Sequence, residues 1–174
     1  MILAVAALLA QVGFPLFSND FPPEEFAKRR AAVFDAIGTK AVAVLQGAPT
    51  PVGYTRFRQS TDFYYLSGVE VPNAYLLLDP VERRTTLYLP HRNERRESSE
   101  GKLFSAEDAE EVRKASGVDA VFGTDLLAEH LARLLQRRSA LTAYTPLFPA
   151  EGTAESRDLA LKEEGLLERY PRAD

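Results

Sequence analysis

The chain has 174 residues, of which 45% are hydrophobic and 26% charged, a composition typical of a folded domain with an apolar core. Its 21 basic and 25 acidic residues give a formal net charge of −4, which offers no electrostatic basis for binding nucleic acid. The chain contains no cysteine, so disulfides, a thiolate nucleophile and a sulfur-ligated metal are excluded. A chain without cysteine does not indicate whether the protein works in an oxidising or a reducing compartment.

Residues 1–20 begin with the apolar run MILAVAALLAQVG. The run is too short to cross a bilayer, which takes about 20 apolar residues, so no membrane span is predicted. Its length suits the core of a signal peptide with Ala10 before a cleavage point, or else a short buried strand or helix. We favour a signal peptide or N-terminal extension, and with it a secreted or periplasmic protein over a cytoplasmic one.

The first element expected is an amphipathic helix in the segment FPPEEFAKRRAAVFDAIG. Two prolines and two glutamates suit its first turn, and Gly38 ends it. Its apolar residues share one face: Phe26, Val33, Phe34 and Ile37. The continuous apolar run at residues 41–47 predicts a strand buried on both faces. The segments NAYLLLDP and TTLYLP, separated by a turn, predict an antiparallel hairpin.

The second half of the chain alternates helix and strand signals. Ser105 followed by Asp108 is a capping box that begins a helix ending at Gly117. VDAVFG and LTAY predict short strands on either side of a helix in TDLLAEHLARLLQRR. The leucine stripe of that helix consists of Leu127, Leu131, Leu134 and Leu135. The basic cluster RNERR is interpreted as a solvated loop.

The order of these elements predicts an α/β fold, a three-layer domain with a mixed β-sheet flanked by helices, over residues 21–145. Residues 146–174 contain proline, glycine, serine and many charged residues. We expect them to be a linker toward a catalytic domain that is absent from this sequence.

Catalytic motifs are sparse. His91 follows a predicted strand and His130 lies in the leucine-striped helix, and neither has a second ligand at metal-binding spacing, so both are interpreted as structural or surface residues. There is no G-x-S-x-G elbow, and GAPTPVG has prolines where a phosphate loop needs free amides. The sequence therefore predicts no self-sufficient active site.

The most informative stretch is FRQSTDFYYLSG, at residues 57–68. Arg58, Gln59 and Asp62 interrupt its apolar run. We expect Arg58 and Asp62 to be mostly buried and bonded to each other, to Gln59 or to backbone, because buried polar groups take partners. On that basis Asp62→Ala would cost roughly 3–5 kcal/mol.

Read as an extended segment, the same stretch separates its aromatic side chains. Phe63 and Tyr65 point one way and Tyr64 the other, since side chains alternate along a strand. The face that carries Tyr64 is then available to a partner, and tyrosine suits an interface because it joins an apolar ring to a polar tip. The alternative is that Tyr64 packs under a loop of its own chain.

The run FRQSTDFYYLSGVEVPNAYLLL resembles the signature of the N-terminal domain of Xaa-Pro aminopeptidases (aminopeptidase P, in the creatinase/prolidase superfamily). Similar segments continue in order over about residues 23–145, and LYLPHRNERRESSEG keeps Arg92, Asn93, Glu97 and Gly101 of the family pattern. One departure is Ser99, where the family commonly has tryptophan. The resemblance implies a creatinase/aminopeptidase P N-terminal domain-like fold with a ribonuclease H-like motif.

The resemblance also implies a function. The parent enzymes release an N-terminal residue that precedes proline, by hydrolysis that depends on two metal ions, usually manganese. In the family those ions are held by a following pita-bread domain, which is absent from this sequence. No catalytic residue, metal ligand or cofactor is therefore assigned to the chain, and we expect it to be inactive as a peptidase on its own.

Within such a parent enzyme, the domain would contribute oligomer contacts and part of the substrate entrance. The resemblance places Tyr64 at the active-site mouth of a neighbouring subunit, with Arg58 and Asp62 assigned to the same surface. We expect one structural polar cluster, which consists of Arg58, Gln59, Asp62, Arg92 and Asn93. The expected partners are the protein's own catalytic domain, further copies and proline-containing peptides. The alternative function is a non-enzymatic protein-binding module, as in creatinase-like domains of histone-chaperone subunits.

Overall fold

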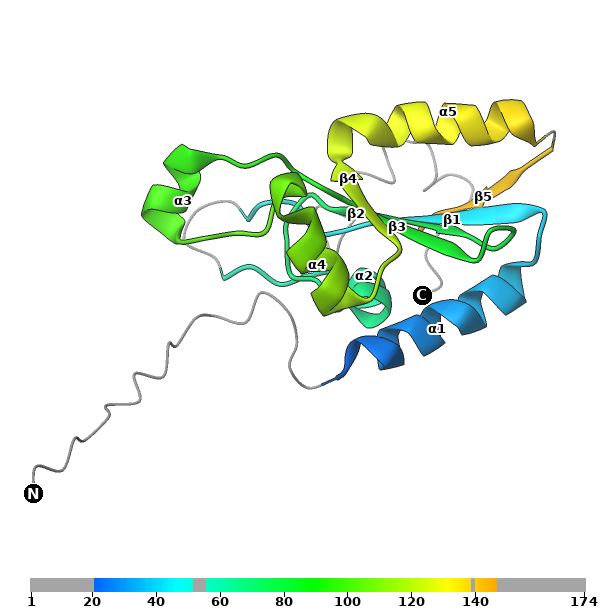
Figure 1. The fold of residues 1–174 in the computed structure, drawn as a ribbon, viewed down its shortest axis with the longest axis horizontal. Helices are drawn as coiled ribbons and strands as arrows, with labels where there is room; N and C mark the ends of the chain where they lie inside the picture. The colour runs from blue at the N-terminus through cyan, green and yellow to red at the C-terminus, as the bar shows by residue number, and fades with distance from the viewer. Residues whose placement is uncertain (1–20, 52–55, 139, 147–174) are drawn as a thin grey trace, which may run out of the picture.

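A mixed sheet is the central layer of the computed structural model, which describes residues 21–51, 56–138 and 140–146 (Figure 1). Its strands are β1 (Ala41–Gln46), β2 (Tyr75–Asp79), β3 (Arg84–Leu89), β4 (Ala120–Gly123) and β5 (Thr142–Tyr144). They lie in the order β4-β3-β2-β1-β5. The β1–β2 and β2–β3 pairs are antiparallel, and the β3–β4 and β1–β5 pairs are parallel. The predicted hairpin is confirmed.

Helices cover both faces of the sheet. They are α1 (Pro23–Ile37), α2 (Thr61–Ser67), α3 (Glu94–Glu100), α4 (Ala109–Ser116) and α5 (Leu127–Arg137), with short 3-10 turns η1 (Ala106–Asp108) and η2 (Thr124–Leu126). Figure 1 shows α1, α2 and α4 on one side of the sheet, α5 on the other, and α3 beyond its end. The predicted α/β fold with a mixed sheet between helical layers is confirmed. Among the described residues, no helix has the length and apolarity to cross a membrane.

Alternation along the central hairpin supplies two apolar cores. Leu76 of β2 and its partner Leu87 of β3 are fully buried on the face covered by α1, α2 and α4. Leu77 and Tyr88, one position further along each strand, belong to the opposite core under α5. Because successive side chains point to opposite faces, a continuous apolar run serves both layers.

The outer helices follow their predicted apolar stripes, with one exception. Phe26 and Phe34 of α1 are buried, and Leu134 of α5 is buried against the second core. Leu135, predicted to belong to the α5 stripe, is 56% exposed. The next residue along a helix is rotated by about 100°, which carries Leu135 away from the sheet.

Two predicted local structures are wrong. The RNERR segment is not a loop, because its last residues form the first turns of α3. The Asn93 side chain accepts a hydrogen bond from the Arg96 amide at 3.1 Å and so caps that helix. The second error concerns FRQSTDFYYLSG, of which residues 61–67 are helical instead of extended.

The burial pattern of α2 follows the period of a helix. Phe63, Leu66 and Ser67 are buried at spacings of three and four, whereas Tyr65 is 54% exposed. Gly68, with φ 68°, ends the helix in the left-handed conformation common at helix C-termini. The extended interpretation, which placed Phe63 and Tyr65 on one side, is therefore wrong. The predicted signal peptide (residues 1–20) and all of the predicted linker except Pro146 lie outside the described residues.

A buried arginine connects α1 to the C-terminal ends of α2 and α4. Arg30 is 2% exposed; its Nη1 donates to the Leu66 carbonyl at 3.0 Å and the Ser116 carbonyl at 3.4 Å. Its Nη2 donates to the Gly117 carbonyl at 2.6 Å. The last carbonyls of a helix lack partners within it and carry the negative end of the helix dipole, so a cation suits them. Burial lowers the Arg30 pKa to about 10, against a smaller opposing effect of Asp119, and the guanidinium stays charged at neutral pH.

We predict that Arg30→Met lowers the free energy of unfolding by about 3 kcal/mol, because three buried carbonyl oxygens lose a charged donor. Urea denaturation measures the change. The matched control is Arg113→Met on α4, whose ion pair with Glu110 is exposed and should be worth less than about 0.5 kcal/mol. Equal losses for the two variants would contradict the structural role of Arg30.

Candidate functional site

Gln59 connects three stretches of chain that border α2. Its Oε1 accepts hydrogen bonds from the amides of Ala48 at 2.6 Å and Ser60 at 3.0 Å. Its Nε2 donates to the carbonyls of Val69 at 3.2 Å and Val71 at 3.0 Å. One side-chain amide thereby uses both its donors and its acceptor, and it positions the turn after β1, the start of α2 and the segment after α2.

Two glycines allow the backbone to come this close. A Cβ on Gly47 would lie 3.0 Å from Oε1 of Gln59. A Cβ on Gly68 would lie 2.5 Å from the ring of Phe26, well inside van der Waals contact. Phe26 of α1 therefore packs directly on the backbone that ends α2, and the orientation of α2 depends on both contacts.

A cavity of about 490 Å³ borders α2. Its lining residues are Phe21, Arg29, Arg58, Gln59, Thr61, Tyr64, Tyr65 and Glu70. Tyr64 and Arg58, two of the three residues assigned from sequence to the substrate entrance, lie together here. Aromatic rings beside charges of both signs give this cavity the polar and apolar contacts that a peptide or a protein loop requires.

Arg29 organises the aromatic side of this cavity. Its guanidinium carbon lies 4.6 Å from the ring centroid of Phe21 and 4.5 Å from that of Tyr65, within the range of cation–π attraction. Arg29 also donates to Glu25 at 3.1 Å and to the carbonyl of Tyr65 at 3.2 Å. Arg29 was not predicted as a site residue, although its spacing of four from Glu25 on a helix was a usable signal.

The prediction that Arg58 and Asp62 are mostly buried is wrong, because both residues are exposed. Arg58 precedes α2, and Asp62 lies in its first turn, where it lines a separate groove of about 340 Å³ with Tyr65 and Tyr144. For Asp62 the cause is the helical conformation of α2, which assigns the buried positions to Phe63, Leu66 and Ser67. Of the predicted trio, Gln59 makes the hydrogen bonds to backbone.

Arg92 and Asn93 form their hydrogen bonds with a different set of residues from Gln59. Arg92 Nη2 pairs with Asp108 Oδ1 at 2.7 Å, while Asn93 caps α3. Asp108 also accepts from the hydroxyl of Ser105 at 2.8 Å, which confirms the predicted capping box. The hydrogen bonds of the five residues assigned to one polar cluster thus belong to separate groups, one around Gln59 and one around Asp108.

His91 joins three segments near the start of η1 and η2. Its Nδ1 lies 2.7 Å from Glu107 Oε1 and its Nε2 lies 2.9 Å from Asp125 Oδ1. Hydrogen bonds to Glu107 and then Asp125 raise the His91 pKa, because both favour the imidazolium. The bond from His91 lowers the Glu107 pKa to about 2. The two carboxylates bind opposite ring nitrogens, and among the described residues no group of three His, Cys, Asp or Glu could hold a metal ion.

We predict that Gln59→Leu lowers the free energy of unfolding by about 2–4 kcal/mol, because four backbone groups lose their partner. Asp62→Ala, which removes an exposed carboxylate near a helix N-terminus, should cost less than about 1 kcal/mol. Urea denaturation of both variants tests the assignment. A greater loss for Asp62→Ala than for Gln59→Leu would contradict the assignment of the main structural contacts to Gln59.

Stability should also depend on pH through His91. The raised His91 pKa means that its stabilisation is complete below the unfolded value of about 6.5 and is lost as pH rises through the folded value. The lowered Glu107 pKa acts at the acid end, where stabilisation is lost as pH falls from about 4.3 toward about 2. Melting temperatures across pH 2–9 should therefore decline on the alkaline side in the wild type and less in His91→Gln. Identical curves of melting temperature against pH for the wild type and His91→Gln would rule out a contribution of His91.

Comparison with known proteins identifies the family. The family model described as "Aminopeptidase P, N-terminal domain" matches residues 26–144. A protein from Pyricularia oryzae named "Probable Xaa-Pro aminopeptidase" is 33% identical over 118 residues, which are 64% of this chain and 22% of the relative. "Intermediate cleaving peptidase 55, mitochondrial" of Arabidopsis thaliana is 28% identical over 121 residues, 67% of this chain and 24% of that protein.

Solved structures agree on the fold. Aminopeptidase PepP of Pseudomonas aeruginosa superposes with a TM-score of 0.63 at 24% identity, covering 86% of this chain and 34% of that one. The chain thus spans less than a quarter of the length of the two curated relatives and about a third of the solved structure. Because the family model matches well over half of the sequence, the chain belongs to the aminopeptidase P N-terminal domain family.

Proposed function

We propose that the chain is the non-catalytic N-terminal domain of a Xaa-Pro aminopeptidase, which releases an N-terminal residue preceding proline. The cavity beside α2 forms part of the substrate entrance. The observation that carries this proposal is that Tyr64 and Arg58 line one cavity together with the aromatic residues around Arg29. The domain also contributes contacts to its own catalytic domain and to further copies of the protein.

The lining of this cavity supports recognition of a proline-containing peptide. Phe21, Tyr64 and Tyr65 offer aromatic surface on which a prolyl ring can pack, as in other grooves that bind proline-rich segments. Glu70 supplies a carboxylate on the same wall, which attracts the positive amino group of a peptide. Arg58 supplies the opposite charge for a carbonyl or carboxylate group.

The two metal ions of the family, usually manganese, do not fit the described residues. Within the described ranges, no three metal-ligating side chains come close enough to share an ion. Glu107 and Asp125 both contact His91, but they bind opposite nitrogens of its imidazole ring. No catalytic step is therefore assigned to this chain, and the ions belong to a further domain of the parent enzyme.

Kinetics of the full-length gene product test the proposal. Tyr64→Ala should raise KM or lower kcat for an Arg-Pro-Pro peptide without lowering the melting temperature, because Tyr64 is partly exposed in the cavity. The matched control is Leu135→Ala, which removes an exposed apolar side chain from α5 on the opposite layer and should leave both constants unchanged. The 174-residue chain with added manganese should leave the peptide intact.

Three results would contradict the proposal. Peptide turnover by the purified 174-residue chain that is abolished by chelators would place the active site here. A Tyr64→Ala variant that melts early but has unchanged kinetics would make Tyr64 a core residue. A gene product whose remaining sequence lacks the family's metal ligands would favour the protein-binding module.

A further inference from the structure

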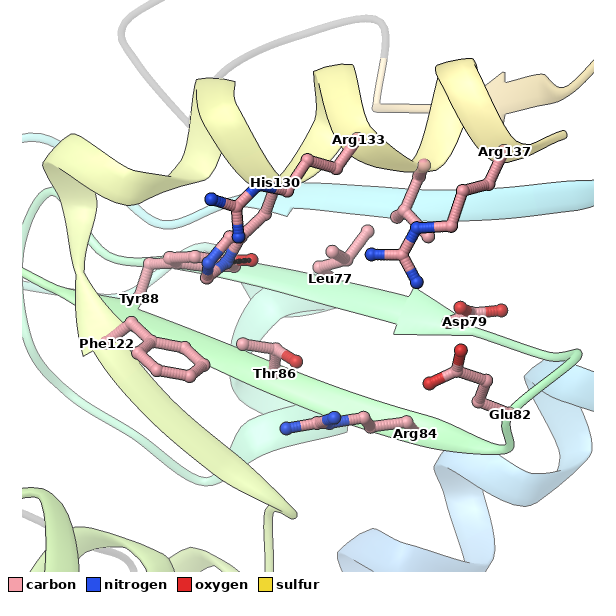
Figure 2. Close-up of a pocket in the computed structure, with 11 residues that line it drawn as sticks. Leu77, Asp79, Glu82, Arg84, Thr86, Tyr88, Phe122, His130, Arg133 and Arg137 are labelled. Carbon is pink, nitrogen blue, oxygen red and sulfur yellow. Dashed lines mark hydrogen bonds between the residues drawn. The ribbon is translucent and has the colours of Figure 1, made fainter.

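Helix α5 presents a polar side to the sheet that it covers. His130, Arg133, Leu134 and Arg137 follow the spacing i, i+3, i+4, i+7 and so share one face of the helix. The apolar stripe of α5, with Leu127, Leu131 and Leu134, packs on the second core, and the basic or imidazole side chains of this face lie beside that stripe. They leave a cavity of about 200 Å³ between α5 and the strands. Figure 2 shows His130 and Arg137 directed from α5 toward the sheet.

The strands supply the opposite wall of this cavity. Arg84, Thr86 and Tyr88 are alternate residues of β3 and therefore point to the same face. Leu77 from β2 and Phe122 from β4 add apolar surface on either side of them (Figure 2). The cavity thus combines an apolar part with a row of polar groups on one strand.

Two arginines in this cavity have no partner of their own. Neither Arg84 nor Arg137 forms an ion pair or a side-chain hydrogen bond with another described residue. They approach the cavity from opposite walls, Arg84 from β3 and Arg137 from α5 (Figure 2). Arg133 differs, because it pairs with Glu129 on its own helix. Both side chains are exposed, so two solvated guanidinium groups without an ion-pair partner border the cavity.

Two carboxylates at the rim share a third arginine. Asp79 binds both Nη atoms of Arg138, at 2.7 and 2.8 Å, which is the geometry of a strong carboxylate–guanidinium contact. Glu82 Oε1 lies 3.7 Å from Nη2 of the same arginine. Because one guanidinium carries one charge, the two acids and the three arginines Arg84, Arg137 and Arg138 together keep a net positive charge of one.

A buried hydroxyl points into the same space. Thr86 is 7% exposed, and its hydroxyl has no hydrogen-bond partner among the described residues. Since no fully buried side-chain polar atom in the described ranges lacks a partner, this hydroxyl opens into the cavity. The neighbouring Tyr88 hydroxyl lies 2.9 Å from His130 Nδ1, and burial raises the Tyr88 pKa to about 12, so Tyr88 adds no negative charge.

We propose that this cavity is a binding site for a phosphate monoester, with the phosphate between Arg84 and Arg137 on the Thr86 hydroxyl. Two guanidinium forks and a hydroxyl offer more donors than the two oxygens of a carboxylate can use well, whereas a phosphate has three acceptor oxygens. The organic part of the ligand packs on Phe122 and Leu77, and the volume of the cavity accommodates a group about the size of one aromatic ring.

Isothermal titration of the 174-residue chain with phenyl phosphate tests the site. Phenyl phosphate should bind about tenfold more tightly than benzoate, which has one charge, and more tightly than inorganic phosphate, which lacks the ring. Phenol, which lacks the phosphate, should not bind measurably. Backbone amide shifts on titration should be confined to β3 and α5.

Substitutions distinguish specific binding at this site from non-specific attraction of anions to the protein. Arg84→Gln and Arg137→Gln should each weaken phenyl phosphate binding about tenfold, the usual worth of one charge-assisted contact. Thr86→Val, which keeps the shape of the side chain, should weaken it severalfold. The matched control is Arg113→Gln, an exposed residue of α4 on the far layer, which removes the same charge and should leave affinity within twofold. Unchanged affinity in the Arg84→Gln, Arg137→Gln double variant, or no saturable binding in the wild type, would overturn the proposal.

Discussion

One buried guanidinium holds the helical layer of this domain together. Arg30 lies in the apolar stripe of α1, between Phe26 and Phe34, yet it donates to carbonyls at the ends of both α2 and α4. A buried charge is costly unless each of its donors finds a partner, and these carbonyls need partners of their own. The hydrogen bonds of Arg30 thus couple α1 to two short helices, α2 and α4, which are seven and eight residues long.

The position of α2 follows from this coupling and determines how the tyrosines of this helix are presented. Arg30 binds the last turn of α2, Phe26 packs on Gly68, and Gln59 ties the start of α2 to the turn after β1. A short helix restrained at both ends can present the tyrosines of its outer side at a constant position. Rigid presentation would suit the proposed substrate entrance, because little ordering entropy would be lost on binding.

The two layers on either side of the sheet differ in character. The core beneath α1, α2 and α4 is large and apolar, and every polar side chain within it that is fully buried has a partner among the described residues. The core beneath α5 is small, and it borders a cavity with unpaired arginines and a buried hydroxyl. The second layer retains Arg84 and Arg137, exposed arginines without an ion-pair partner, and the Thr86 hydroxyl, which the proposed phosphate site would use.

Local signals predicted much of this fold and little of its site. The start and end of α1, the β2–β3 hairpin and the Ser105–Asp108 capping box each depend on residues a few positions apart, and all were predicted correctly. The stretch FRQSTDFYYLSG was different, because its apolar residues suit both a strand and a helix. Contacts of this stretch with Phe26 and Arg30, more than 25 residues earlier in the chain, favour the helix, and no local pattern contains these contacts.

By itself, the sequence determined the family, the α/β class and the strand order along the hairpin, since these depend on periodicity and on a recognisable run of residues. Only the tertiary structure decided which polar residues are buried. Arg58 and Asp62 turned out exposed, while Gln59 and Arg30 make the backbone contacts. It also brought Arg84 and Arg137, 53 positions apart in the numbering, to one cavity. Hydrogen-bond partners and shared cavities depend on how helices pack across a sheet, and packing distances are not encoded in the spacing of residues along the chain.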